Sequence, residues 1–145
     1  MWKGALLQIS STDEPKQNLE LINNMINSAA AKNVEFVALP ETANCISNSN
    51  LHKETVLQKE KEDMTLASLT EVAKKKSIYI LIGSLAIKQN KPKNKFLNRS
   101  FLIDPSGSII AKYDKIHMFD ATISDSEEYS ESASFVAGKN AKVIS

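Results

Sequence analysis

A glutamate and a lysine each follow an apolar stretch of this sequence, and together they could carry out acid–base chemistry on a small substrate. Glu41 comes directly after Ala38-Leu39-Pro40, where an apolar segment ends. Lys115 lies in the segment 111–120, AKYDKIHMFD, which mixes charged, aromatic and aliphatic residues. A glutamate can act as a general base, and a lysine can stabilise negative charge that develops on a carbonyl oxygen. Because α/β sheets bind ligands beyond the carboxyl ends of their strands, both positions suit a functional site.

The same two residue types also have ordinary explanations. A glutamate and a lysine in one domain form a simple salt bridge far more often than a catalytic pair. Lys112 and Lys115 would also fit the solvated end of a strand. Neither Glu41 nor Lys115 is a nucleophile, so the pair alone could not form a covalent intermediate with a substrate. The residue types therefore leave a salt bridge and a catalytic pair both open.

The one cysteine of the chain, Cys45, is a weak candidate for a nucleophile. It lies shortly after Glu41 and beside Ile46, with no cationic residue nearby in sequence. A thiol in such surroundings behaves as a small hydrophobic group unless something lowers its pKa. An arrangement of Cys45 with His117, as in cysteine hydrolases, is therefore disfavoured.

The two histidines do not belong to a recognisable metal-binding motif. Asp114 and Asp120 lie near His117, but neither His117 nor His52 is part of an H-x-x-H or H-x-E pattern. We therefore expect no metal and no cofactor.

Apolar and amphipathic segments alternate along the chain and predict an α/β fold with a mixed sheet. Segments rich in apolar or β-branched residues are expected to be strands, namely 4–10, 34–39, 78–87, 96–103 and 108–113. Apolar residues at helical spacing predict a helix over 15–32. They predict a second helix with Asp63 as its N-cap and 74–76 as its last turn. A short exposed helix is expected near 53–61.

The last third of the chain has the pattern of a hairpin followed by irregular structure. Asp104-Pro105-Ser106-Gly107 has Asp, Pro and Gly where a type I turn favours them, so it should join the last two strands. Beyond Asp120, residues 124–131 are expected to form an acidic loop. Residues 141–144 are expected to begin a further strand.

The composition excludes several classes of protein. The chain has 145 residues, 42% of them hydrophobic and 24% charged, which suits one globular domain. Its 18 basic and 17 acidic residues give a net charge of +1, so neither nucleic acid nor a membrane is expected as a partner. The longest apolar stretch, 78–87, is too short to span a bilayer. A single cysteine and the lack of a signal-peptide pattern favour a cytoplasmic location.

Several short motifs in a consistent order resemble those of the nitrilase (carbon–nitrogen hydrolase) superfamily. They are Leu39-Pro40-Glu41, Ile82-Gly83-Ser84, Asn98-Arg99-Ser100, Asp104-Pro105-Ser106-Gly107, the segment 113–120 and Tyr129-Ser130-Glu131-Ser132. Each motif is weak alone, but their order and spacing together are specific. The chain is most similar to the Nit-type branch, whose members hydrolyse deaminated glutathione or related ω-amides.

The resemblance implies a fold and a set of catalytic roles. The family fold is an α-β-β-α sandwich, and its members hydrolyse non-peptide C–N bonds of small amides through a Glu–Lys–Cys triad. By resemblance, Glu41 matches the general base, Lys115 the residue that stabilises the oxyanion, and Glu131 a second glutamate that braces the site. The family's cysteine belongs to a later G-x-x-I-C-Y-D-like segment, so the resemblance also argues against Cys45.

The resemblance therefore implies that residues 1–145 are the N-terminal part of a carbon–nitrogen hydrolase domain, truncated before the cysteine segment. Such a chain is expected to be inactive alone and to act on a small amide only when completed. It should form homo-oligomers or bind a complementing C-terminal half. The alternative is a non-catalytic α/β module that binds a partner chain through an exposed sheet edge.

Overall fold

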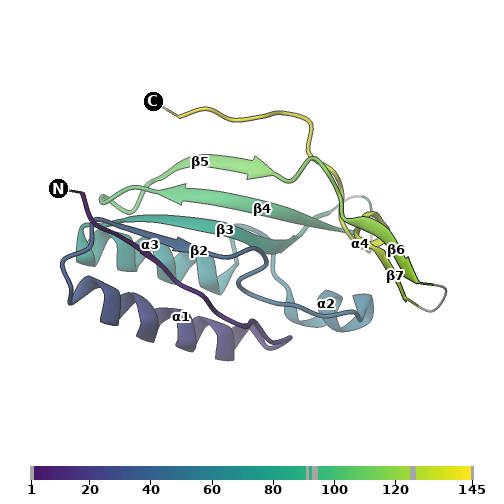
Figure 1. The fold of residues 1–145 in the computed structure, drawn as a ribbon, viewed down its shortest axis with the longest axis horizontal. Coiled ribbons are helices and arrows are strands. Elements are labelled where there is room, and N and C mark those ends of the chain that lie inside the picture. Colours follow the sequence, from purple (N-terminus) through teal and green to yellow (C-terminus); the bar gives the residue numbers. More distant parts are fainter. Residues whose placement is uncertain (1, 91, 93–94, 125–126, 145) are drawn as a thin grey trace.

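The computed structural model describes residues 2–90, 92, 95–124 and 127–144, and it contains a five-stranded sheet with helices against one face (Figure 1). The strands are β1 (Gly4–Leu6), β2 (Phe36–Leu39), β3 (Tyr79–Lys88), β4 (Phe96–Ile103), β5 (Ile109–Asp114), β6 (Asp120–Ser124) and β7 (Glu127–Ser130). The helices are α1 (Pro15–Ala30), α2 (Asn50–Val56), α3 (Met64–Lys76) and α4 (Glu131–Ser134). Strands β6 and β7 form a separate antiparallel pair at one end of the sheet.

The main sheet is mixed, as the sequence predicts. Its strands lie in the order β1-β2-β3-β4-β5; β1, β2 and β3 pair in parallel, and β4 and β5 continue the sheet in antiparallel pairing. This arrangement points β2, β3 and β5 in the same direction. The carboxyl ends of β2 and β5 therefore reach the same end of the sheet.

The hydrophobic core lies between the sheet and helices α1 and α3. Ile22 and Ile26 of α1 and Leu69 of α3 are fully buried against alternate residues of the central strands, which include Val37, Ile80, Ile82, Phe101 and Ile103. The period of two along each strand and the three- or four-residue spacing along each helix are those of a half-buried sheet covered by amphipathic helices.

The opposite face of the sheet is also apolar. Paired positions place one row of residues across it, namely Leu6, Ala38, Leu81, Leu102 and Ala111. We call the face that carries this row the open face, because among the described residues no helix lies over it (Figure 1). Leu6 is 85% exposed. An apolar sheet face of this kind is typical of a surface that another layer covers.

Several boundaries differ from those that the sequence predicts. The first strand ends at Leu6 rather than at residue 10. The short helix begins at Asn50, because the Ser49 side chain accepts a hydrogen bond from the His52 N–H and caps it there. The largest error concerns the loop predicted over 124–131: Ser124 ends β6, β7 follows and Glu131 begins α4, while 125–126 lie outside the described residues. Residues 141–144 are not in a strand. Within the described part of the chain, no helix combines the length and apolar character needed to cross a membrane.

A buried asparagine attaches the loop after β2 to the middle of the sheet. The Asn44 side chain accepts a hydrogen bond from the Ala86 N–H (2.8 Å) and donates one to the Ala86 carbonyl oxygen (3.0 Å). The amide therefore replaces a missing neighbouring strand for both polar groups of Ala86. Its Nδ2 also lies 3.5 Å from the Asp63 carboxylate that caps α3.

Replacing Asn44 with alanine should lower the free energy of unfolding by about 2–4 kcal/mol, because both polar groups of Ala86 would be buried without partners. Urea unfolding followed by circular dichroism measures this change. Asn24→Ala, on the exposed surface of α1, is the matched control and should change it by less than about 0.5 kcal/mol. Equal effects of the two substitutions would contradict this assignment.

Candidate active site

One lysine lies between two glutamates at the end of the sheet. The Lys115 Nζ lies 2.8 Å from Glu41 Oε1 and 2.7 Å from Glu131 Oε2. The side-chain amide of Asn98 joins the same group, because its nitrogen donates to Glu41 Oε1 (2.6 Å) and to Glu131 Oε1 (2.9 Å). Glu41 and Lys115 are therefore in direct contact, and Glu131 joins them.

The sheet topology explains why these residues meet. Glu41 follows β2, Lys115 follows β5, and both strands end on the same side. Asn98 lies on β4, beside the end of β5, and its carbonyl oxygen accepts a hydrogen bond from the Lys115 N–H (2.9 Å). Glu131 is the first residue of α4, and its own N–H donates to the Phe119 carbonyl oxygen. The β6–β7 hairpin thus returns the chain to the sheet and delivers the second carboxylate.

The Glu41 loop is fixed by a close approach of two backbones. β3 has an irregularity between Ile82 and Leu85, and a Cβ on Gly83 would lie only 2.4 Å from the Leu39 carbonyl oxygen. The Thr42 N–H donates to the Ser84 side chain (2.8 Å), although Thr42 has a positive φ of 47° that a β-branched residue rarely adopts. Only a glycine at position 83 lets the chain pass this close, and the passage sets the position of Glu41.

The Lys115 backbone is held from both sides. Besides the bond from its N–H to β4, its carbonyl oxygen accepts a hydrogen bond from the Gly138 N–H (2.8 Å). A Cβ on Gly138 would lie 2.2 Å from the Asp114 carbonyl oxygen, so the segment after α4 also needs a glycine where it crosses β5. These contacts leave the lysine little freedom to move away from the carboxylates.

The charges of the site stabilise one another. Burial alone would lower the pKa of Lys115, but hydrogen bonds to Glu131 and Glu41 outweigh it and the pKa is raised. Burial alone would raise the pKa of Glu131, but hydrogen bonds from Lys115, the Phe119 N–H and Asn98 outweigh it and the pKa is lowered. Near neutral pH the site therefore contains an ammonium group beside ionised Glu131.

Asn98 is the member of this group to which the sequence analysis gave no role. It is almost fully buried, and a buried asparagine on a strand needs partners for its amide group. The sequence did contain a signal for Asn98: it is a polar residue on a strand whose other buried residues, such as Phe96 and Phe101, are apolar.

Cys45 has the properties of a structural cysteine, in agreement with the sequence analysis. Its side chain is 2% exposed and packs in a small cluster with Leu57, Ala86 and Phe96. Burial, followed by the nearby negative charge of Asp13, raises the pKa of the Cys45 thiol to about 11. A thiol with such a pKa has almost no thiolate at neutral pH.

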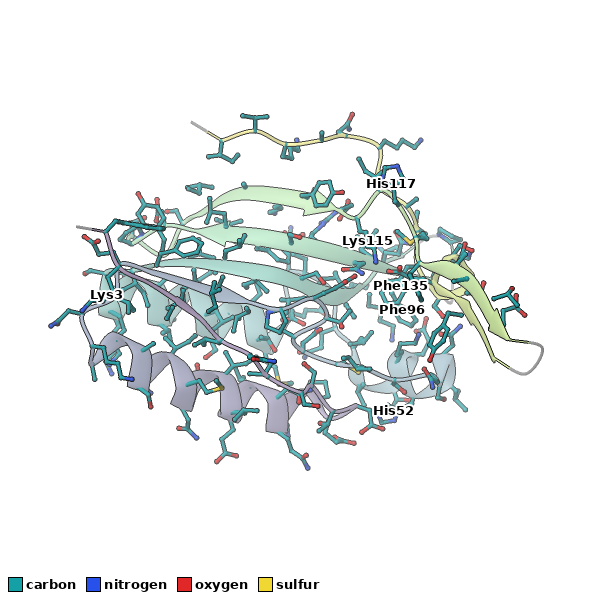
Figure 2. The ribbon with its side chains drawn as sticks, in the orientation of Figure 1. Lys3, His52, Phe96, Lys115, His117 and Phe135 are labelled. Atoms are coloured by element: carbon teal, nitrogen blue, oxygen red, sulfur yellow. The ribbon has the colours of Figure 1, made fainter. Side chains whose placement is uncertain are left out.

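The histidines remain outside the lysine site. Figure 2 places His52 on the helix side of the sheet and His117 on the other side. The Nε2 atom of His52 lies 3.0 Å from the Asp13 carbonyl oxygen, near the exposed carboxylates of Asp13 and Glu14. Asp114 pairs with Arg99 instead, so the suggested grouping of histidines and aspartates does not form.

The glutamates and the lysine open into a cleft of about 790 Å³. Its walls come from the loop after β2, from α2, β4 and β7, and from α4, and they include Ile46, Lys53, Phe119, Tyr129 and Phe135. The site therefore combines an ammonium, two carboxylates and an adjacent hollow that is wide enough for a small organic molecule.

A comparison with known protein families identifies the chain. The sequence model described as carbon–nitrogen hydrolase matches residues 3–145, which is almost the whole chain. The chain belongs to the carbon–nitrogen hydrolase family. The resemblance noted from the sequence motifs is thereby confirmed.

Relatives of this carbon–nitrogen hydrolase chain include named amidases. It is 29% identical over 140 residues to a deaminated glutathione amidase of Synechocystis, a match that covers 93% of this chain and 49% of that protein. It is 29% identical over 134 residues to the human omega-amidase NIT2, covering 92% of this chain and 47% of that protein. The chain thus spans about half the length of the curated relatives that it matches.

Solved structures have the same fold. The Caenorhabditis elegans NitFhit protein superposes with a TM-score of 0.80 at 26% identity, over 96% of this chain and 34% of that chain. The NitN amidase of Nesterenkonia superposes with a TM-score of 0.76 at 20% identity, over 97% of this chain and 51% of that chain. The predicted fold class is therefore confirmed as a nitrilase-superfamily fold.

The pKa of Glu131 should lie below that of an ordinary glutamate, about 4.3, in a ¹³C NMR titration of the side-chain carboxyl groups. Because this pKa is lowered in the folded state, the pairing of Glu131 stabilises the fold above the unfolded-state pKa and is lost as pH falls through the folded-state pKa. Lys115→Met should raise the pKa of Glu131. Lys112→Met is the control: Lys112 lies on β5 and pairs with Glu60 instead, so its loss should leave the pKa of Glu131 unchanged.

Proposed function

We propose that this chain supplies the glutamate–lysine half of an amidase active site that hydrolyses a small linear amide. The observation that carries the proposal is the Lys115 ammonium, bound by Glu41 and Glu131 at the mouth of a cleft in a carbon–nitrogen hydrolase. Arg99 also pairs with two carboxylates, those of Glu60 and Asp114, so it is the buried Asn98 amide and the larger adjacent cleft that distinguish the Lys115 group from a structural salt bridge.

The two glutamates have different surroundings, which favours different roles. The Glu131 side chain is 13% exposed, and both of its oxygens accept hydrogen bonds, from Asn98, Lys115 and the Phe119 N–H. The Glu41 side chain is 55% exposed, and among the described residues only its Oε1 accepts hydrogen bonds. Glu41 therefore has a free oxygen to accept a proton and suits the general base, while Glu131 suits a fixed brace for Lys115.

The nucleophile in this proposal is a cysteine from outside residues 1–145. Glu41 takes the proton of that thiol, and the thiolate attacks the carbonyl carbon of the amide. Lys115 stabilises the oxyanion of the tetrahedral intermediate, which collapses to a thioester as ammonia leaves with a proton from Glu41. A water molecule, deprotonated by Glu41, then attacks the thioester, releases the carboxylic acid and restores the thiol.

The names of the relatives support a substrate class. The similar proteins named above are a deaminated glutathione amidase and an omega-amidase. We therefore propose a primary amide on a short linear chain as the substrate. In the NitN amidase, which has the same fold, a variant has been solved with butyramide.

The open face suits the half of the family domain that these residues do not include. Its apolar row lies opposite the helices, and the chain matches only about half of each curated relative. A complementing C-terminal half would cover this face and bring the cysteine to the cleft. The alternative, a module that binds a partner chain through an exposed sheet edge without catalysis, predicts no turnover.

In the test, residues 1–145 are expressed together with a polypeptide from the same genome that matches the other half of the relatives' sequences. The two parts can be produced as one chain or as two. The completed protein should release ammonia from succinamate, and Glu41→Gln should lower kcat by roughly 10²- to 10⁴-fold through loss of the base. Glu35→Gln, an exposed glutamate beside β2, is the matched control and should retain activity. Binding of the two halves without ammonia release would instead support the binding module, as would the absence of such a polypeptide.

The isolated chain should self-associate through the open face, because its apolar row would otherwise remain in contact with water. Size-exclusion chromatography with light scattering should detect oligomers, and Leu6→Lys should shift them towards monomer. Leu51→Lys is the matched control, since Leu51 is similarly exposed but lies on α2, away from this face. A monomeric chain, or an equal effect of both substitutions, would contradict the assignment.

A further inference from the structure

A second lysine lines the same cleft, and no counter-ion for it lies in the described part of the chain. The Lys53 residue on α2 is 4% exposed, yet it forms no ion pair with any carboxylate among the described residues. Its ammonium group lies over two aromatic rings: the Nζ is 5.5 Å from the centre of the Phe96 ring and 5.2 Å from that of Phe135. Burial lowers the pKa of Lys53, partly offset by Cys45, so its surroundings do not fully compensate the charge.

We propose that Lys53 binds a carboxylate at the far end of the amide substrate and thereby selects anionic ω-amides over neutral amides. This inference rests on the function proposed above, because it assigns the second end of the same cleft. A buried ammonium without an anion is costly, and a substrate carboxylate would supply the missing partner with a charge-assisted hydrogen bond.

The position of Lys53 relative to the catalytic group fits a short substrate. Phe96, which Lys53 contacts, lies two residues before Asn98 on β4, and Asn98 binds both glutamates. Two residues along a strand span roughly 7 Å, so the part of β4 beside Lys53 is close to the part that binds the glutamates, and Lys53 and Lys115 line the same cleft. Figure 2 shows Phe96, Phe135 and Lys115 at the same end of the sheet.

The described carboxylates that line the cleft do not form an ion pair with Lys53. Glu41 and Glu131 are engaged with Lys115, and Glu128 lies on the exposed hairpin strand β7. The rings of Phe96 and Phe135 keep water away from one side of the ammonium and attract the cation through their faces. A purely structural role remains the competing explanation, in which Lys53 only holds α2 against these rings.

The experiment compares two amides of equal length in the completed protein: succinamate, which carries a carboxylate, and butyramide, which carries a methyl group in its place. Wild type should prefer succinamate in kcat/KM. Lys53→Met should lower the ratio of kcat/KM for succinamate to that for butyramide by about 10- to 100-fold, mainly through KM, as expected for loss of one charged hydrogen bond. Lys53→Arg should retain much of the preference, and Lys75→Met, on the exposed surface of α3, should leave the ratio unchanged.

The outcomes separate the two proposals. Equal use of both amides by wild type, or an equal loss for both in Lys53→Met together with a lower melting temperature, would overturn the Lys53 assignment and leave the amidase function intact. Absence of turnover of either amide by wild type would overturn the proposed function. In that case calorimetric titration with succinamate and butyramide decides the Lys53 assignment, which requires tighter binding of succinamate that Lys53→Met abolishes.

Discussion

The Lys115 ammonium, held between Glu41 and Glu131, is the interaction on which the rest of the site depends. Moving a cation partly out of water is unfavourable, and two carboxylates with an asparagine amide are what make it stable here. The same contacts raise the pKa of Lys115 and keep it charged. A charged lysine that is fixed before substrate binds is what stabilisation of an oxyanion requires, because no reorganisation is then needed during the reaction.

This arrangement requires close contacts between backbone segments at the end of the sheet. Gly83 lets β3 pass directly beneath the chain that leads to Glu41, and Gly138 lets the segment after α4 cross the end of β5. Neither position has room for a Cβ atom. Gly83 therefore sets the position of Glu41, and Gly138 that of Lys115, through backbone contacts. Lys53, at the other wall of the cleft, has no carboxylate partner among the residues that the structure describes, and this difference is why we propose that it binds the substrate.

The sequence predicts most of the fold, because apolar periodicity and turn chemistry were clear for the sheet and its helices. The turn 104–107 forms with the Gly107 N–H bonded to the Asp104 carbonyl oxygen, and Asp63 caps α3 as expected. Glu41 and Lys115 were identified as candidate site residues because each follows an apolar stretch of the sequence. The β6–β7 hairpin was missed, because its polar strands lack apolar alternation and are ordered by contacts such as the Phe119 N–H to Glu131. Asn98 and Lys53 were missed because their importance depends on neighbours distant in sequence.

The measurement that tests the central claim most directly is turnover and melting temperature of Lys115→Met, determined together in the completed protein. If Lys115 stabilises the oxyanion, kcat should fall by about 10²- to 10³-fold or more, while the melting temperature changes by only a few degrees. If Lys115 instead serves only as a salt bridge that supports the fold, turnover per folded molecule should stay within a few-fold of wild type while the melting temperature falls. That second result would contradict the account.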